Sequence, residues 1–235
     1  MLHALGSCGA NWMYQIPYFQ SEYEVITIDM RGHGRSSKPQ GPYSISTFAE
    51  DVAHLLSSLE IGPAHVIGFS LGSFVALQLA CDFPHLVKTL TLTGTTSSVQ
   101  DIGRWTLFFR RLLLRFCSMK TAAAVIAYSL FPRPNQAWIR AMCKQKIASN
   151  DKRVYTCVLQ ELSHFNVKER LKEISCPVLV VVGTEDSLTP SWHAEAIVKR
   201  VKHGEMAFIE GSAHACPLDA PEKFNALVLA FLQRH

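Results

Sequence analysis

The motif G-x-S-x-G at residues 68–72 places Ser70 where a serine could act as a nucleophile. A short apolar run at residues 66–67 precedes the motif and is typical of a strand, and a segment with helical character follows at residues 75–80. A serine on a sharp turn between a strand and a helix exposes its hydroxyl, and the free N–H groups at the helix start suit an oxyanion. We therefore predict a nucleophile at Ser70; the alternative is an ordinary turn in which the serine caps the helix.

A nucleophilic serine needs a base within hydrogen-bond reach and an acid that orients the base. The apolar run at residues 178–182 leads into a turn with two acids, Glu185 and Asp186, and the run at residues 206–209 leads into a loop that reaches His214. Because the carboxyl ends of parallel strands meet at one edge of a sheet, we expect Ser70, Asp186 and His214 to meet there. Asp186 is preferred over Glu185 because it is closer to the apex of the turn.

The chain has ten histidines, so the choice of the base needs a reason. Only His3, His33 and His214 fall in loops at the predicted active edge, whereas the others fall in or beside helices and strands, at the end of the inserted segment, or at polar ends. His214 follows the last predicted strand and is therefore the expected base.

The elements that must position these residues alternate along the chain between strands and helices. The predicted strands are residues 25–28, 65–67, 90–93, 178–182 and 206–209. The predicted helices are residues 47–59, the segment after Ser70 to about residue 81, and residues 191–201 and 221–232. A capping box of Thr47 and Glu50 is expected to begin the first of these helices. This order predicts an α/β fold with a doubly wound, mostly parallel sheet.

Residues 97–165 are expected to form a helical cap inserted in a core of residues 1–96 and 166–235. The insertion has no strand pattern, and an insertion after the carboxyl end of a strand lies over the ligand site. Its apolar residues recur at helical spacing and predict an apolar underside: Trp105, Phe108, Phe109, Leu112, Leu113 and Phe116. Its basic residues predict a solvated face, and a helix that binds a membrane surface is the less favoured alternative: Arg104, Arg110, Arg111, Arg115 and Lys120.

The composition bounds the classes of protein to which the chain can belong. With 235 residues, 48% apolar and 18% charged, the chain can bury a large core, and its net charge of +4 is too small to indicate a nucleic-acid partner. Seven cysteines without paired or metal-ligand spacing predict reduced thiols and a cytoplasmic location. No apolar run reaches the ~18 residues that span a bilayer, and the first ten residues do not resemble a targeting segment. The oligomeric state stays open.

Five segments together carry a resemblance to a known family. They are residues 3–6, 29–36, 68–72, 183–186 with Pro190, and 211–214. On these segments the chain resembles the α/β-hydrolase family over nearly its whole length, and within it the serine esterases, enol-lactonases and cofactor-free haloperoxidases. The resemblance implies a catalytic triad of Ser70, Asp186 and His214. It also implies an oxyanion hole made by the backbone N–H groups of Leu5 and Leu71.

The chain departs from the family pattern in two places, both near its start. Ala4 follows His3 where the family usually has glycine, and the family's first two strands and most of its third have no counterpart. With roughly two dozen residues absent, we expect a short, exposed sheet edge and a weakly held Leu5. The turn at residues 32–34 is expected to shape the site rather than carry a proton.

The expected function is that of a carboxylesterase, which cleaves small carboxylic esters through an acyl-enzyme intermediate. The apolar cap favours an acyl or alcohol group of modest size, and no metal or organic cofactor is expected. The alternatives are a lactonase or a carbon–carbon bond hydrolase with the same triad, or a non-catalytic ligand-binding member of the fold. Relatives that open epoxides or remove halogens carry an aspartate in place of Ser70, so those activities are disfavoured.

Overall fold

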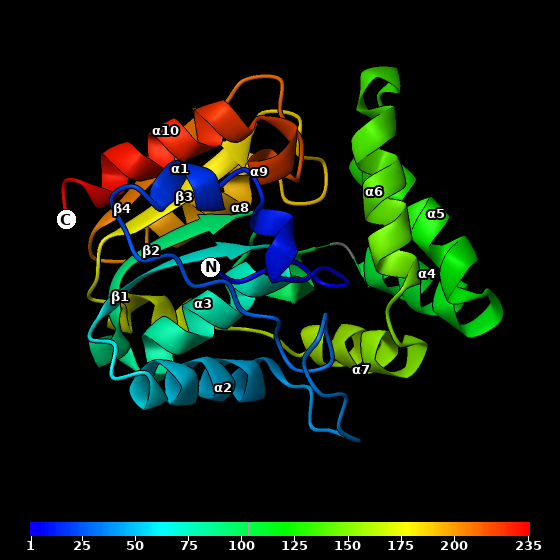
Figure 1. Ribbon diagram of the computed structural model, residues 1–235, viewed down its shortest axis with the longest axis horizontal. Coiled ribbons are helices and arrows are strands. Elements are labelled where there is room, and N and C mark those ends of the chain that lie inside the picture. The colour runs from blue at the N-terminus through cyan, green and yellow to red at the C-terminus, as the bar shows by residue number, and fades with distance from the viewer. Residues whose placement is uncertain (103) are drawn as a thin grey trace.

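A computed structural model describes residues 1–102 and 104–235, and its centre is a parallel sheet of four strands (Figure 1). The strands lie in the order β1-β2-β3-β4, and each neighbouring pair is parallel. Their bounds are Ala64–Phe69 for β1, Val87–Thr93 for β2, Val178–Gly183 for β3 and Gly204–Ile209 for β4. Every residue of β3 is buried, which is typical of a parallel strand covered on both faces. The predicted α/β fold with a doubly wound sheet is therefore confirmed.

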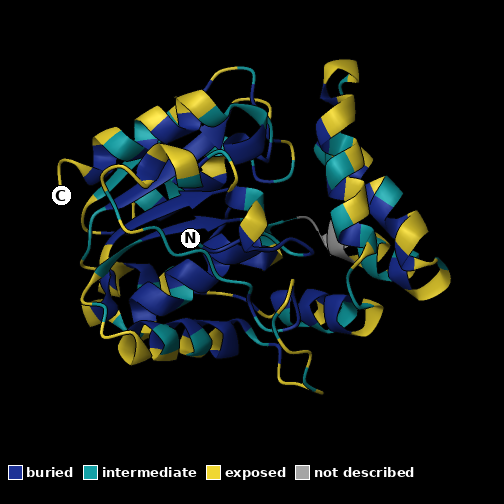
Figure 2. Cartoon of the chain, viewed as in Figure 1, coloured by how far each residue is buried: buried dark blue, intermediate teal, exposed yellow. Residues whose placement is uncertain are grey.

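Helices cover both faces of the sheet and divide the core into two clusters. One cluster lies under α2 (Ile45–Ser58), α3 (Leu71–Asp82) and α8 (Ser191–Val198). The other lies under α1 (Ile16–Phe19), α9 (Cys216–Asp219) and α10 (Pro221–Leu232). Figure 2 shows the strands and helix α3 mostly as buried. Since α3 is buried on nearly all sides, its position is fixed by packing, and so is the position of its first residues.

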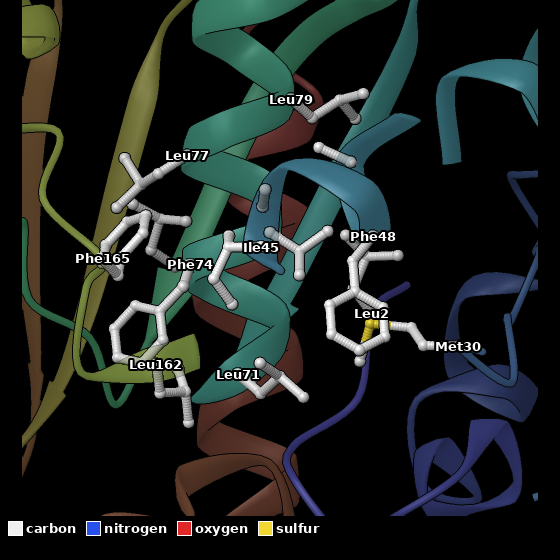
Figure 3. Packing of buried hydrophobic residues seen from close by; sticks show 14 of the residues in the cluster. Leu2, Met30, Ile45, Phe48, Leu71, Phe74, Leu77, Leu79, Leu162 and Phe165 are labelled. Carbon is white, nitrogen blue, oxygen red and sulfur yellow. The ribbon is translucent and has the colours of Figure 1, made fainter. Parts of the chain in front are cut away.

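The first cluster joins the sheet to the segments that surround the start of α3. Leu2 packs in the same cluster as Met30 and Phe48, and Phe74 of α3 faces Phe165, with 4.9 Å between the ring centroids (Figure 3). Residues from both ends of the insertion and from the N-terminal segment therefore share one core with the helix that follows Ser70.

Four longer helices lie between β2 and β3, in the segment predicted to be the cap. They are α4 (Arg104–Phe116), α5 (Met119–Leu130), α6 (Ala137–Ala148) and α7 (Lys152–Leu162). In Figure 1, α4, α5 and α6 project from one side of the molecule, and α7 runs back towards α2 and α3. The Val167 N–H donates to the Ser97 carbonyl at 2.8 Å, and the Val99 N–H donates to the Phe165 carbonyl at 3.1 Å. These bonds hold the two ends of the segment together, and we propose residues 97–165 as the bounds of the cap.

The prediction that α4 has an apolar underside is wrong for most of its residues. Leu114 is the buried leucine of this helix, at 1% exposure, and it was not among the residues predicted to face inward. Four of the predicted residues are exposed: Phe108, Phe109, Leu112 and Phe116. Apolar residues surround α4 on more than one side, so their spacing does not select the face that packs on the neighbouring helices. The side chains of Arg104 and Trp105 lie outside the described residues.

Two local predictions are also wrong. Residues 25–28 form no strand: Ile28 makes an isolated bridge to Leu2, and the Ile26 carbonyl accepts a hydrogen bond from the amino group of Met1. Thr47 does not cap α2. Instead, Ser44 is the N-cap, and its hydroxyl accepts a hydrogen bond from the Thr47 N–H at 3.1 Å. Serine and threonine are both good N-caps, so the residue type alone does not decide between them. The N-cap lies three residues earlier than the pattern suggested.

The N-terminal segment is held from both sides, so the prediction of a weakly held Leu5 is wrong. The Leu2 N–H donates to the Ile67 carbonyl at 2.8 Å, and the Phe69 N–H donates to the Leu2 carbonyl at 3.0 Å. Leu2 and His3 are each 1% exposed. The backbone that leads to Leu5 is therefore paired with β1 immediately before the serine.

His3 fixes this segment through a neutral ring. Its Nε2 accepts a hydrogen bond from the Met30 N–H at 3.1 Å, and its Nδ1 lies 2.8 Å from the Ala4 carbonyl oxygen. One tautomer, with the proton on Nδ1, satisfies both contacts. Burial, and next the neighbouring His33, lower the pKa of His3 to about 3, so the ring stays neutral in the folded protein.

Gly72 lies where α3 meets the N-terminal segment, and replacing it by alanine should loosen both. A Cβ at position 72 would overlap the Leu2 carbonyl oxygen and lie 2.9 Å from the His3 carbonyl oxygen. We expect Gly72→Ala to lower the free energy of unfolding by about 1–3 kcal/mol, measured by urea denaturation. Gly62→Ala is the matched control, since no atom lies within 4 Å of its Cβ. Equal stability of the two variants would contradict this view of the contact.

His3→Gln should change the dependence of stability on pH. The unfolded state takes up a proton on His3 below about pH 6.5 and the folded state only near pH 3, so acidification favours unfolding between these values. From pH 7 to 4.5 this effect should remove about 2–3 kcal/mol of the wild-type free energy of unfolding. Glutamine keeps an acceptor for the Met30 N–H without titrating, so the variant should lose correspondingly less. Urea denaturation at both pH values measures the difference, and parallel losses would refute the assignment.

Candidate active site

Ser70 occupies a strained turn between β1 and α3, as its motif predicted. Its backbone has φ 53° and ψ −113°, a region that residues other than glycine rarely adopt and that typically costs about 1–3 kcal/mol. The flanking glycines permit this turn, because a Cβ at Gly68 would lie 2.5 Å from the Gly72 carbonyl oxygen. The Ser70 N–H donates to the Thr93 carbonyl at 3.0 Å, which ties the turn to β2.

His214 lies beside this serine, with 3.3 Å between its Nε2 and the Ser70 Oγ. The imidazole is buried and packs against the Phe69 ring, at 5.7 Å between centroids. Gly94, at the end of β2, makes room for it, because a Cβ there would lie 2.8 Å from the His214 Cε1. The sequence analysis did not select Gly94, although a glycine directly after a predicted strand is a usable signal.

Asp186 completes the connection on the far side of the imidazole. Its Oδ2 lies 2.9 Å from the His214 Nδ1 and accepts a hydrogen bond from the Thr189 hydroxyl at 2.6 Å. Its Oδ1 accepts hydrogen bonds from the N–H groups of Leu188 at 2.8 Å and Thr189 at 2.9 Å. Burial alone would raise the pKa of this carboxyl, but the charge and hydrogen bond of His214 and the bonds from Thr189 outweigh burial and lower the pKa. The carboxylate therefore stays ionised at neutral pH.

The competing acid, Glu185, points elsewhere. Its carboxylate pairs with Arg133, and its side chain is 53% exposed. Of the two acids in the turn, the structure brings only Asp186 to His214. Thr189 is a further residue that the sequence analysis missed, and its spacing of three from Asp186 is a recognisable turn pattern.

Leu5 and Leu71 border the same space as Ser70 and His214. Leu71 is the first residue of α3, so its N–H has no partner within the helix. Within residues 1–102 and 104–235, neither the Leu5 N–H nor the Leu71 N–H donates to a protein acceptor. Both groups are therefore free to bind a ligand oxygen, and the oxyanion hole that the family resemblance implied stays a prediction.

The remaining loop histidine does not reach this group. The His33 ring lies 5.1 Å from the His3 ring, and its Nδ1 lies 3.1 Å from the Arg31 carbonyl oxygen. Burial lowers the pKa of His33. Its position beside His3 is that of a residue that shapes the loop before Leu5, which is the role expected from the sequence.

Two small cavities meet at Ser70 under the cap, each with a volume of about 70 Å³. We call them lobe A and lobe B. Lobe A reaches α5, α6 and α7 through Ile126, Phe131, Ile147 and Tyr155. Lobe B reaches α3 and α7 through Phe74, Val99, Leu159 and Leu162. Leu5, Ser70, Arg110 and His214 border both lobes, so a bound molecule could extend to either side of the serine.

Two kinds of feature are absent from the described part of the chain, residues 1–102 and 104–235. No group of three or more His, Cys, Asp or Glu side chains there could hold a metal ion. No helix in that part has the length and apolar character needed to cross a bilayer.

Comparison with known proteins agrees with the fold. A family model described as the alpha/beta hydrolase fold matches residues 1–119. The chain is 30% identical to 3-oxoadipate enol-lactonase 2 of Acinetobacter baylyi, over 99% of this chain and 87% of the relative. A hydrolase from Pseudomonas aeruginosa superimposes with a TM-score of 0.90 at 26% identity, covering 98% of this chain and 88% of that one. The enol-lactonase of Burkholderia xenovorans has a TM-score of 0.91 at 22% identity, covering 99% and 89%, and shares the fold. The chain belongs to the α/β hydrolase family.

Proposed function

We propose that this hydrolase cleaves small carboxylic esters through an acyl-enzyme intermediate, with Ser70, His214 and Asp186 as its catalytic residues. The observation that carries the proposal is the continuous chain of contacts through the imidazole. Ser70 Oγ lies 3.3 Å from one ring nitrogen of His214, and Asp186 Oδ2 lies 2.9 Å from the other. Such a chain activates a serine hydroxyl at neutral pH.

In the first half of the proposed reaction the Ser70 oxygen attacks the ester carbonyl carbon, and its proton passes to the His214 Nε2. The negative charge on the carbonyl oxygen is stabilised by the free N–H groups of Leu5 and Leu71. When the carbon–oxygen bond to the alcohol breaks, the imidazolium gives the proton to the leaving oxygen. In the second half a water molecule takes the place of the alcohol, which releases the acid and restores the Ser70 hydroxyl.

Asp186 acts in this scheme through its charge and position. It stabilises the imidazolium that forms at each half-reaction and fixes the tautomer in which Nδ1 carries the proton. Its bonds from Thr189 and Leu188 hold the carboxylate in place when the ring charge changes. Because its pKa is lowered, Asp186 should stay ionised on mild acidification and keep its interaction with the imidazole.

Lactone hydrolysis is the second candidate, because the relative from Acinetobacter baylyi is named an enol-lactonase. A lactone is a cyclic ester, so the same steps apply and the leaving oxygen stays attached to the acyl group.

All seven cysteines are free thiols, which supports the proposed cytoplasmic location.

Ser70→Ala should remove the turnover of p-nitrophenyl butyrate and leave the fold unchanged. We expect kcat to fall by at least about 10⁴-fold, because the nucleophile is lost while the protein remains folded. Ser57→Ala, at an exposed position of α2, is the control and should behave as wild type. A purified Ser70→Ala protein that kept most of its turnover would exclude the proposed mechanism. A folded wild type that neither hydrolyses esters nor reacts with a fluorophosphonate probe would indicate a binding protein.

The two acids of the 183–190 turn provide a matched pair of variants. Asp186→Asn keeps the shape but removes the charge and the correct tautomer of His214, so kcat should fall by about 10³–10⁴-fold. Glu185→Gln disturbs only a half-exposed ion pair with Arg133 and should stay within about 3-fold of wild type. Steady-state kinetics with p-nitrophenyl butyrate compares them, and similar losses in both variants would remove Asp186 from the triad.

A further inference from the structure

The cavities around Ser70 are lined by two cationic side chains and by no acidic one. Arg110, from α4, lines both lobe A and lobe B, and Lys146, from α6, lines lobe A alone. No aspartate or glutamate is among the described residues that line either lobe. A neutral ester would leave this positive charge uncompensated. The charge of the pocket therefore favours a substrate that carries a negative charge.

Arg110 differs from most of the partly buried arginines because no carboxylate pairs with it. Arg31, Arg133 and Arg170 each form an ion pair, whereas Arg110 forms none among the described residues. The five residues without described side chains, 103–107, include no acid. Partial burial of a guanidinium without a paired anion costs free energy, and a bound anion offsets that cost. Arg110 is therefore available to an anionic ligand.

Tyr155, from α7, supplies a second donor in lobe A. Its side chain is 2% exposed and lies against the loop that carries Leu5, because a Cβ at Gly6 would lie 2.8 Å from its Cε2. Burial raises the pKa of Tyr155, and the charge of nearby Arg110 offsets this in part, so the phenol stays protonated. Tyr155 is one of the residues that line lobe A, and its hydroxyl makes no hydrogen bond in the part of the chain that the structure describes.

We propose that the substrate carries a carboxylate, which Arg110 and Tyr155 bind in lobe A close to the ester group. This proposal rests on the proposed ester hydrolysis and specifies its substrate class. A single guanidinium matches the single charge of a carboxylate and can donate two parallel hydrogen bonds to it. The rest of the substrate is aliphatic, since lobe B is lined by apolar side chains such as Phe74, Ile102 and Leu162.

Two esters of equal chain length test the proposal. One is the mono-p-nitrophenyl ester of glutaric acid, which ends in a carboxylate, and the other is p-nitrophenyl pentanoate, which ends in a methyl group. The quantity measured is the ratio of kcat/KM for the charged ester to kcat/KM for the neutral one. We expect Arg110→Gln to lower this ratio by about 10- to 100-fold, mainly through KM for the charged ester.

Two variants serve as controls. Arg115→Gln removes an exposed arginine of the same helix that lines neither lobe, and it should leave the ratio unchanged. Lys146→Gln tests the other cation of lobe A. If the ratio falls in Lys146→Gln and not in Arg110→Gln, the carboxylate site is assigned to the wrong residue. If the ratio falls in none of the variants, the proposed substrate class is wrong while the ester-hydrolase proposal stands.

A binding measurement separates this proposal from the proposed function. The Ser70→Ala variant cannot form the acyl-enzyme. Glutarate binding to this variant, measured by titration calorimetry, therefore does not depend on turnover. We expect glutarate to bind Ser70→Ala and to bind at least about 10-fold more weakly when Arg110→Gln is added. Equal binding to both proteins, or none to either, would overturn the carboxylate site. Binding with the expected difference in a protein that hydrolyses no ester would overturn the proposed function alone.

Discussion

The close approach of the N-terminal segment to the start of α3 is the contact on which the rest of the site depends. Gly72 has no side chain, so the Leu2 and His3 carbonyl groups can lie against the first turn of the helix. Ser70, two residues before Gly72, has a positive φ, and Leu5 and Leu71 border the same cavity as this serine. One steric condition therefore sets the nucleophile and both candidate oxyanion donors, and the strain at Ser70 is offset by the packing around it.

That Ser70, Asp186 and His214 lie together could be predicted from the sequence, because each follows a strand whose pattern is clear locally. The apolar runs of β3 and β4 end at the turns that carry Asp186 and His214, and parallel strands bring such turns to one edge. The segment at residues 25–28 has an equally good strand pattern and forms no strand. Pairing depends on the segment that lies alongside, and here it amounts to one isolated bridge between Ile28 and Leu2. A strand is thus a property of two segments, and a pattern in one of them is not sufficient.

The cap shows a second limit on what a local sequence pattern can predict. Helical spacing indicated a helix where α4 lies, but it did not indicate that Leu114 would face inward while Phe116 stays 75% exposed. Nor could it separate Arg110, which borders the serine, from Arg115, which is exposed on the same helix. These positions are set by how α4 packs on α5 and α7, and that packing involves residues distant in sequence.

The charged side chains around Ser70 have to be considered together. Asp186 is the buried acid nearest Ser70, and its two oxygens are already occupied by His214, Thr189 and Leu188. In the proposed reaction this carboxylate balances the imidazolium, so it does not also balance Arg110. The lining of the two lobes contains Arg110 and Lys146 and no aspartate or glutamate, so the pocket lacks a negative charge. A substrate that brings its own carboxylate supplies that charge and is held by it on the correct side of Ser70.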